Sequence, residues 1–432
     1  MSQFSLIRTS RFGPFFWTQF LGAFNDNAFK FSLTIWVTYQ LSVDWLTPAL
    51  GGLVIGALFI LPYILFSATA GQLADKFNKV TFMCRLKELE FVIMLLAFYG
   101  FFNHQIGILL FCLFMMGFQS TMFGPAKYAY LPESLKPGEL IGANGLVEMG
   151  TFMAILLGNM LGGFLISLPT NGVLMVSFSV VFIALMGRWS ASKIPVLAST
   201  SPDLKINWNP LTETWKNLSL AYQDRLTFRS MLGISWMWFF GAVFLSEFPV
   251  FSKEILSGNS HVATLLLVIF SIGVGIGALM CEFISRFKPI LGLVLIGALG
   301  MSFFTIDLYF SIKDLPKVPL MGLNDFVGKT ENWHVMMDLF FISLSTGLYS
   351  VPMYTLIQQK SLTSHRARII AANNVLNALF MVASALLTGF LLHVGWTIPE
   401  AFLAIGITTL IFVFFVFWRN PIYRNSFRKW FG

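Results

Sequence analysis

The stretch Gly71-Gln-Leu-Ala-Asp75-Lys76-Phe-Asn-Lys79 separates two long apolar runs of the chain, at about 49–73 and 81–102. Each run has at least the length of about 20 residues that crosses about 30 Å of hydrocarbon. The stretch between them is short and charged, so it predicts a turn at a membrane surface that joins two spanning helices. An ordinary charged turn satisfies this pattern, and the rest of the chain must decide whether the turn has a further role.

The composition is that of a membrane protein. Of the 432 residues, 56% are hydrophobic and 11% are charged, whereas a soluble domain carries about 25% charged residues. We expect twelve spanning runs, at about 14–40, 49–73, 81–102, 105–129, 140–167, 171–191, 230–256, 261–285, 289–311, 335–358, 369–394 and 397–418. The longest polar stretch divides six runs from six, which predicts an N-terminal half (1–192), a cytoplasmic linker (193–229) and a C-terminal half (230–432).

The charge pattern predicts the orientation. The net charge is +8, and nearly all Lys and Arg residues fall in alternate connections, as the positive-inside rule describes for cytoplasmic loops. The predicted outer segments hold only Lys253, Lys313, Lys317 and Lys329. Both termini are therefore expected in the cytoplasm. Because the basic residues are spread over many short loops, we expect no nucleic-acid partner. The three cysteines fall in predicted helices and indicate no disulfide framework.

A weak repeat relates the two halves. The pairs that share an offset of 227–229 positions are Pro125 and Pro352, Asn144 and Asn373, and Glu148 and Asn377. In each half the last two positions are four residues apart, so they share one face of the fifth helix. Two six-helix halves with internal repeats are the plan of major facilitator transporters, whose substrate site lies near the midplane. Chance similarity between two Asn-containing helices is the alternative.

The opening stretch resembles the major facilitator signature between the second and third spans. Gly71 permits close approach of helices, Asp75 can complement a helix N-terminus or an arginine, and Lys79 can pair back. In that family the motif stabilises one face of the alternating-access cycle, so the resemblance implies a gating role for these three residues. It also implies the fold: an all-α polytopic membrane protein with twelve spans in two pseudo-symmetric halves.

The first spanning run contains an unusual polar cluster, with Asn25, Asp26, Asn27 and Lys30 in its middle. A charged side chain at the centre of a spanning helix costs about 2.5–3.5 kcal/mol on insertion scales, so the cluster needs a polar interior, a partner or a ligand. One alternative is a self-contained pair, because Asp26 and Lys30 are four residues apart. A second charged group, at positions 85–90, starts the third run and is expected at the membrane interface.

Three stretches resemble the bacterial lysophospholipid transporter family. They are Gln19-Phe-Leu-Gly-Ala-Phe-Asn-Asp26-Asn-Ala, Phe123-Gly-Pro125-Ala-Lys127-Tyr128 and Ala143-Asn-Gly-Leu-Val-Glu148. The resemblance implies a flippase of the bacterial inner membrane that moves 2-acyl-glycerophosphoethanolamine from the outer to the inner leaflet. It also implies an acyltransferase/acyl-ACP synthetase, as a partner or fused domain, that re-acylates the lipid. No His-x4-Asp acyltransferase motif occurs in this chain.

The head group of such a lipid suggests the candidate binding residues. An amine needs a carboxylate, and a phosphate needs a cation or amide donors. The candidates are Asn25, Asp26, Lys30, Lys127, Asn144, Glu148, Glu247, Asn373 and Asn377. Asp26 and Glu148 are expected to face the amine, and Lys127 the phosphate. Alternatives are that Lys127 reaches to the interface and that Asn144 and Glu148 join helices. Glu247 stands where a basic residue is common in the family, which bears on head-group preference or ion coupling.

No enzyme constellation is recognisable. The five histidines show no metal-ligand spacing and no phosphate-binding P-loop occurs, so the expected protein is a secondary transporter and not an enzyme. No cofactor is expected apart from a coupling ion, Na⁺ or H⁺. Two other functions fit the same pattern: transport of another amphiphile, such as a siderophore or drug, and a membrane module that scaffolds an acyltransferase.

Overall fold

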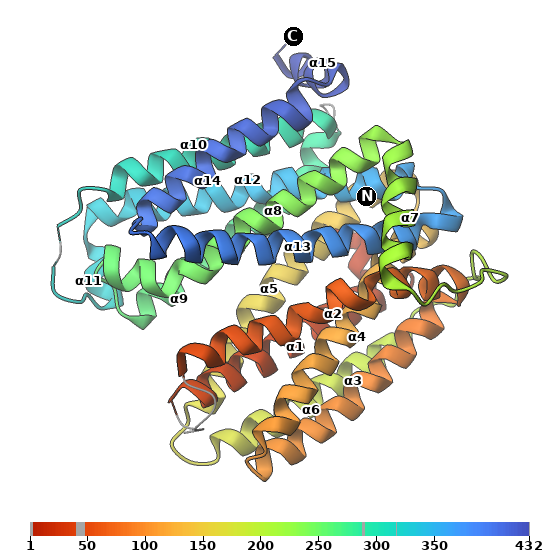
Figure 1. Ribbon diagram of the computed structural model, residues 1–432, viewed down its shortest axis with the longest axis horizontal. Helices are drawn as coiled ribbons and strands as arrows, with labels where there is room; N and C mark the ends of the chain where they lie inside the picture. Colours follow the sequence, from red (N-terminus) through yellow and green to blue (C-terminus); the bar gives the residue numbers. More distant parts are fainter. Residues whose placement is uncertain (1–2, 40–47, 287–289, 317, 432) are drawn as a thin grey trace. The chain divides into compact units, whose positions relative to one another are not determined.

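The computed structural model describes residues 3–39, 48–286, 290–316 and 318–431, which form helices and no strand (Figure 1). The helices are α1 (Gly13–Tyr39), α2 (Pro48–Lys76), α3 (Lys79–Phe102), α4 (Ile106–Ser134), α5 (Leu140–Ile166), α6 (Gly172–Ala191), α7 (Pro210–Gln223), α8 (Arg225–Val250), α9 (Ser260–Ser285), α10 (Ile290–Ile312), α11 (Leu323–Gly328), α12 (Thr330–Lys360), α13 (Arg366–His393), α14 (Ile398–Val413) and α15 (Pro421–Phe431). Short helical turns extend several of them, including η3 (Phe251–Ile255) after α8 and η5 (Phe414–Trp418) after α14.

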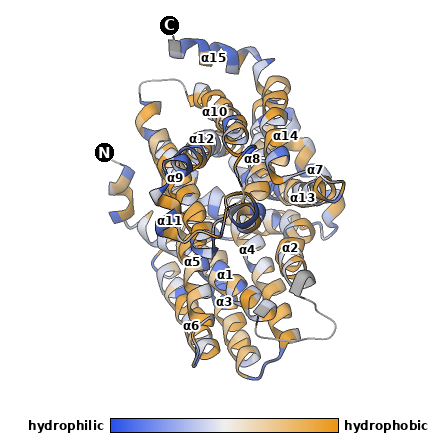
Figure 2. Ribbon diagram, turned by 90° about the vertical axis from the view of Figure 1, so that its left-hand side faces the viewer, coloured by the Kyte–Doolittle hydropathy of each residue, from blue (hydrophilic) through white to orange (hydrophobic). Residues whose placement is uncertain are grey.

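The twelve long helices coincide with the twelve predicted runs, so the expected all-helical, twelve-span fold is confirmed. By length and composition alone, ten of the described helices are apolar enough to cross a membrane. The two remaining long helices, α1 and α3, carry the polar groups described below. Figure 2 shows mostly hydrophobic colouring along the spans and hydrophilic colouring along α15. The spans therefore form because their length matches the bilayer, and not through amphipathic patterning.

Local signals in the sequence set several helix ends. Asn78 caps α3, and its side-chain oxygen accepts from the backbone N–H groups of Val80 and Thr81 at 3.0 Å. Asn259 caps α9 in the same way. Thr397 and Glu400 form a reciprocal capping box at the start of α14. These contacts satisfy N–H groups that have no partner within the helix, which explains why short polar turns suffice between spans.

Contacts divide the chain into two compact units. The first unit comprises residues 1–143, 153–228 and 357–378, and the second comprises residues 144–152, 229–356 and 379–432. Within the first unit, α2 packs on α4, α3 packs on α4 and α6, and α1 packs on α6. Its apolar core includes Phe29, Trp36, Met94, Phe101 and Met116, all at most 2% exposed. The predicted division into residues 1–192, 193–229 and 230–432 is a statement about the sequence repeat and stays a prediction.

The repeat seen in the sequence is visible in local structure. Pro125 lies inside α4 and Pro352 inside α12. Each of these helices is followed by a 3₁₀ turn, Pro137–Glu139 in one half and Thr363–His365 in the other, and then by a long helix that carries the Asn pair member. The same order of elements at corresponding positions favours an internal repeat over chance similarity.

Small residues allow helices to touch backbone to backbone. A Cβ atom added at Gly158 would lie 2.5 Å from the carbonyl oxygen of Phe24, and one at Gly162 would collide with the carbonyl oxygen of Ala28, both on α1. In the second unit, a Cβ at Gly277 on α9 would collide with the backbone of Leu344 on α12. Such close contacts are typical of helix packing in membranes, where van der Waals contact replaces hydrophobic burial.

Candidate functional site

A buried ion pair lies in the interior of the first unit. The ammonium of Lys87 is 2.5 Å from the carboxylate of Glu90, and both side chains are 1% exposed. Glu90 also accepts hydrogen bonds from the amides of Asn25 at 3.0 Å and Gln119 at 3.3 Å. Glu90 is eleven residues from the start of α3, which is about 16 Å along a helix. The network therefore lies near the middle of the span.

This position corrects the expectation that the charges at 85–90 are interfacial. Arg85 is exposed and pairs with Glu88, which is half-buried and also pairs with Arg188 on α6 at 2.8 Å, whereas Lys87 and Glu90 are buried. The helix turns 100° per residue, so positions 87 and 90 face α1 and α4, while position 85 faces outward and position 88 faces Arg188 on α6. The sequence contains a partial indication that Lys87 and Glu90 are buried, because positions 87 and 90 share a helix face with the apolar residues Met83 and Met94, which are buried.

The surrounding helices leave a passage for the Lys87 side chain. A Cβ added at Gly22 on α1 would collide with the Lys87 ammonium, and one at Gly187 on α6 would lie 3.8 Å from the Lys87 Cδ atom. The Lys87 ammonium also lies 5.2 Å from the centre of the Phe123 ring on α4, within the range of a cation–π contact. The absence of a side chain at Gly22 thus gives the ammonium room to reach Glu90, whereas a Cβ at Gly187 would make only ordinary van der Waals contact.

Asp26 belongs to the same polar region. Its carboxylate accepts a hydrogen bond from Ser120 on α4 at 2.5 Å, and the Ser120 hydroxyl lies 3.3 Å from Gln119. The second carboxylate oxygen, Oδ1, is buried and has no hydrogen-bond partner among the described residues. Asp26 is 8% exposed and Asn25 is 0% exposed. The structure therefore joins Asn25 and Asp26 to Glu90 through a continuous set of polar side chains from α1, α3 and α4.

Lys30 is not the direct partner of Asp26 in the described part of the chain, where no ion pair joins the two. Its ammonium instead lies 5.1 Å from the centre of the Phe59 ring on α2. The alternative of a self-contained Asp26–Lys30 pair is therefore not seen. Lys127 donates to the side-chain oxygen of Gln19 on α1 at 3.2 Å, so it reaches towards α1 from the α4 position predicted for it.

The other candidate residues lie on α5, α8 and α13. Asn144, 0% exposed, donates to the hydroxyl of Thr355 on α12 at 3.2 Å, which fits the interhelical alternative. Glu148 is also buried on α5, and Asn373 and Asn377 are buried on α13. Glu247 is partly exposed close to the end of α8, beside the Ser246 hydroxyl at 3.2 Å. The role of these residues in substrate binding stays a prediction.

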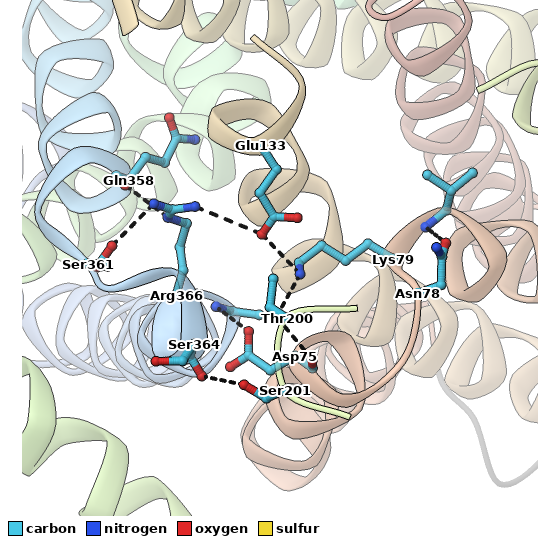
Figure 3. A network of polar contacts seen from close by, with 12 residues as sticks. Asp75, Asn78, Lys79, Glu133, Thr200, Ser201, Gln358, Ser361, Ser364 and Arg366 are labelled. Atoms are coloured by element: carbon cyan, nitrogen blue, oxygen red, sulfur yellow. Dashed lines mark hydrogen bonds and ion pairs between the residues drawn. The ribbon is translucent and has the colours of Figure 1, made fainter. Parts of the chain in front are cut away.

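A second polar network surrounds the motif at residues 71–79, between α2 and α3 (Figure 3). The carboxylate of Asp75 lies 3.2 Å from the guanidinium of Arg368 and accepts from the backbone N–H of Ala367 at 3.2 Å. Asp75 is 0% exposed and Arg368 is 4% exposed. Both N–H groups of residues 367 and 368 lie near the start of α13, where the helix dipole favours an anion. Both partners foreseen for Asp75, an arginine and a helix N-terminus, are present.

Lys79 pairs with Glu133 at the end of α4, at 3.0 Å, and the guanidinium of Arg366 lies 3.9 Å from the same carboxylate. Figure 3 shows Glu133 between the two cations. Gly71 provides the close approach: a Cβ there would lie 2.7 Å from the Cβ of Ala371 and 2.8 Å from the Cα of Arg368. The partner that the sequence did not identify is Glu133, because it is 54 positions away from Lys79.

The linker takes part in this network. The Ser201 backbone N–H donates to the carbonyl oxygen of Asp75 at 3.0 Å, and the Thr200 hydroxyl donates to it at 3.1 Å. The Ser201 hydroxyl donates to the carbonyl oxygen of Ser364 at 3.2 Å. A segment expected only to connect two halves therefore holds the end of α2 against the start of α13. Polar loop composition gives no signal for such a contact.

One group of side chains in the second unit has the composition of a metal site. Asp307 on α10 and His334 and Asp338 on α12 place one ligand atom each within 4.8 Å of one another. His334 Nε2 lies 3.1 Å from Asp307 and 3.6 Å from Asp338. A protonated His334 would also balance the charge of the two carboxylates as an ion-paired cluster without a metal. Sequence spacing alone does not show the group, because its members come from two helices.

Comparison with known proteins agrees with this architecture. The family model described as Major Facilitator Superfamily matches residues 15–382. Among solved structures, the fucose:proton symporter FucP of E. coli aligns with a TM-score of 0.70 at 14% identity, covering 95% of this chain and 98% of that chain. The human organic anion transporter MFSD10 aligns with a TM-score of 0.72 at 11% identity, covering 94% and 99%. At these identities the structures show a shared fold.

Curated relatives cover most of the chain. The lysophospholipid transporter LplT of Escherichia fergusonii is 29% identical over 370 residues, which cover 83% of this chain and 82% of the relative. The lysophospholipid transporter LplT of Photorhabdus laumondii is 25% identical over 404 residues, or 91% of each chain. Together with the twelve spans and the match of the family model over most of the sequence, these similarities show that the chain belongs to the Major Facilitator Superfamily of membrane transporters.

Proposed function

We propose that this transporter moves lysophospholipid of the lysophosphatidylethanolamine type from the outer to the inner leaflet of the bacterial cytoplasmic membrane. The observation that carries the proposal is the Asp26 carboxylate, which is buried in the first unit with one oxygen, Oδ1, unpartnered among the described residues. A buried carboxylate oxygen without a donor is costly, and the ammonium of an ethanolamine head group is a donor of the right charge. The names of the curated relatives support the same substrate class.

The neighbouring groups fit the other parts of that head group. Lys127, also in the first unit, carries the cation that a phosphate requires. Lys127 donates to the neutral side chain of Gln19 at 3.2 Å and lies 4.8 Å from the centre of the Tyr128 ring, and an ion pair with a phosphate would be stronger than either contact. The acyl chain needs only an apolar path. In this proposal, the lipid is recognised through its head group.

Alternating access is the proposed mechanism of movement. The contacts of Asp75 with Arg368, and of Glu133 with Arg366, join α2 and α4 to the start of α13. In the proposed cycle these contacts form in one state and break in the other, so that the substrate pathway opens to one leaflet at a time. Delivery to the inner leaflet would present the lipid to an acyltransferase/acyl-ACP synthetase for re-acylation.

Reconstituted protein tests the proposal directly. Proteoliposomes that contain the purified protein should move labelled lysophosphatidylethanolamine between leaflets faster than protein-free vesicles. Asp26→Asn should reduce this rate strongly, because the charge that faces the amine is lost, whereas Arg85→Gln, a change of an exposed side chain on α3, should leave it unaltered. Equal transport by wild type and Asp26→Asn would remove Asp26 from the mechanism.

The same vesicles separate the rival functions and test the energy source. Transport of a siderophore or drug without movement of lysophospholipid would contradict the proposed substrate. Absence of flux for every amphiphile, together with co-purification of an acyltransferase, would favour a scaffolding role. An imposed Na⁺ gradient and an imposed pH gradient, each applied alone, should identify the proposed coupling ion by the gradient that accelerates flux.

A further inference from the structure

Helix α7 of the linker has an unusual distribution of side chains. Leu211, Trp215 and Tyr222 are 81%, 75% and 62% exposed, and Trp208, just before the helix, is 70% exposed. The opposite side is polar and buried, with Glu213 1% exposed. A soluble helix buries its apolar face and exposes its polar one. In α7 the apolar face is the exposed one. Tyr222 touches the Phe228 ring at 5.2 Å, but most of this face is left uncovered by the described residues and requires another partner.

Helix α7 has three distinct faces around its axis. Leu211, Trp215 and Tyr222 are separated by four and seven residues and so share one face. Thr212, Lys216 and Ser219 are exposed on a second face, about 100° around the helix axis. The third face packs against the first unit, where α7 contacts α2. The helix thus has one face packed on protein, one polar face and one aromatic face. This pattern is typical of a helix at a membrane surface, where Trp and Tyr lie at the level of the head groups.

The connections of α7 place it at that level. Before the helix, the side chain of Gln72 and the backbone of Asn207 exchange two hydrogen bonds, at 2.8 and 2.7 Å. Gln72 lies close to the end of the span α2. Trp208 directly follows Asn207, so it lies near the membrane boundary. After the helix, a single residue, Asp224, leads into the span α8 and caps it. Both ends of α7 are thus tied to ends of spans.

The length of α7 excludes a spanning orientation. Its 14 residues extend about 21 Å, which is shorter than the roughly 30 Å of the hydrocarbon core. Figure 1 shows α7 running across the direction of α2. Because both ends are at span ends, the helix must follow the membrane surface. Lys216 lies beside Trp215, and the positive-inside pattern assigns this side to the cytoplasm, where the leaflet surface is negative.

We propose that α7 is an interfacial helix that inserts Trp208, Leu211, Trp215 and Tyr222 into the cytoplasmic leaflet of the bilayer. The partner is the lipid surface itself, an anionic head-group region over acyl chains. The insertion fixes the linker segment that contacts Asp75 and Ser364 at a defined height against the membrane. This inference does not depend on the identity of the transported substrate.

Spin labels at single cysteines test the two exposed faces. The labels are placed by Leu211→Cys, Trp215→Cys and Tyr222→Cys on the apolar face, and by Thr212→Cys, Lys216→Cys and Ser219→Cys on the polar face. The protein is reconstituted in nanodiscs of phosphatidylethanolamine and phosphatidylglycerol. Cys84 is replaced by serine, and the unlabelled background of the buried Cys112 and Cys281 is measured in a variant without an introduced cysteine.

Collision with molecular oxygen, which enters lipid, is compared with collision with a water-soluble nickel chelate. The apolar-face labels should be accessible to oxygen and protected from nickel, at about 5–10 Å below the head groups, and the polar-face labels should show the reverse. Equal nickel access on both faces would overturn the proposal, since the helix would then be in water. Protection of the apolar face from both reagents would also overturn it, because another protein surface would cover that face.

A double substitution tests whether the two tryptophans hold the apolar face of α7 in the lipid. Trp208→Ser with Trp215→Ser should move a label at position 211 towards water, while Thr212→Ala with Ser219→Ala should leave its depth unchanged. Size-exclusion chromatography of each variant confirms that the protein is folded, so a failed fold cannot be mistaken for loss of insertion. An unchanged depth in the folded tryptophan variant would contradict the assigned role of these side chains.

Discussion

The ion pair between Lys87 and Glu90 makes a quantitative prediction about the interior of this transporter. Both side chains are 1% exposed and their charged atoms are 2.5 Å apart. Replacing one member leaves the other as a buried charge without its counter-ion, which costs about 3–5 kcal/mol. We therefore expect Lys87→Met and Glu90→Gln each to lower the free energy of unfolding by about 3–5 kcal/mol, a change of two or more powers of ten in the unfolding equilibrium.

The double variant should behave differently. Lys87→Met with Glu90→Gln removes both charges and keeps a carbonyl oxygen at position 90, which can accept from Asn25 and Gln119. Replacing a whole buried pair by uncharged groups is often neutral or stabilising. We therefore expect a loss of at most about 2 kcal/mol, although additive effects of the two single changes would predict about 6–10 kcal/mol. The double-mutant cycle thus isolates the coupling between the two charges.

Reversible unfolding in mixed micelles, followed by circular dichroism, measures these differences. Arg85→Gln is the matched control, because Arg85, whose side chain is 75% exposed, pairs with Glu88 at the same spacing of three residues, while Glu88 keeps its contact with Arg188 on α6, and this change should leave the unfolding curve unchanged. Single variants that each lose less than about 1 kcal/mol would show that the pair is solvated. A double variant as unstable as the sum would show that the two charges are not coupled.

Two further changes test the packing and the network at the start of α13. Asp75→Asn should lower stability by about 3–5 kcal/mol in the same unfolding assay and should slow transport, because the buried guanidinium of Arg368 at 3.2 Å loses its counter-ion; unaltered values for both would refute the assigned contact. Gly277→Val should abolish the monodisperse peak in size-exclusion chromatography, because a side chain there collides with the backbone of Leu344, while Gly389→Val, with nothing within 4 Å of an added Cβ, should keep that peak.

The spans were predictable because the bilayer imposes a simple rule on composition. The predicted runs at 81–102 and 261–285 become helices Lys79–Phe102 and Ser260–Ser285, since any long apolar segment must satisfy its backbone hydrogen bonds internally in lipid. The same rule could not detect α7 and α15, which lie in polar stretches. Their formation depends on capping, as by Asn209 before Pro210, and on surfaces that composition does not reveal.

The site was predictable only where a charge interrupts an apolar run. Asn25 and Asp26 were conspicuous for that reason, and the structure places both in a buried network. Glu90 was misassigned because it follows Arg85 and Glu88 in a charged segment near the start of a span. The sequence carries both pairs at a spacing of three residues, and only the orientation of α3 decides which one is buried. The sequence did not predict a role for Glu133, because its partners Lys79 and Arg366 are distant from it in the chain.

Stability alone gives no reason for the charges of Lys87 and Glu90. An apolar pair of similar volume would fill the same space without the cost of removing two ions from water. What the pair provides is a strong acceptor in the middle of α3, to which Asn25 on α1 and Gln119 on α4 donate. These contacts fix the rotation of α1 at the residue that precedes Asp26, whose own carboxylate is held by Ser120. The buried pair therefore acts as a support that orients the proposed head-group site, and a variant that keeps the fold but removes the acceptor at position 90 should lose substrate affinity before it loses structure.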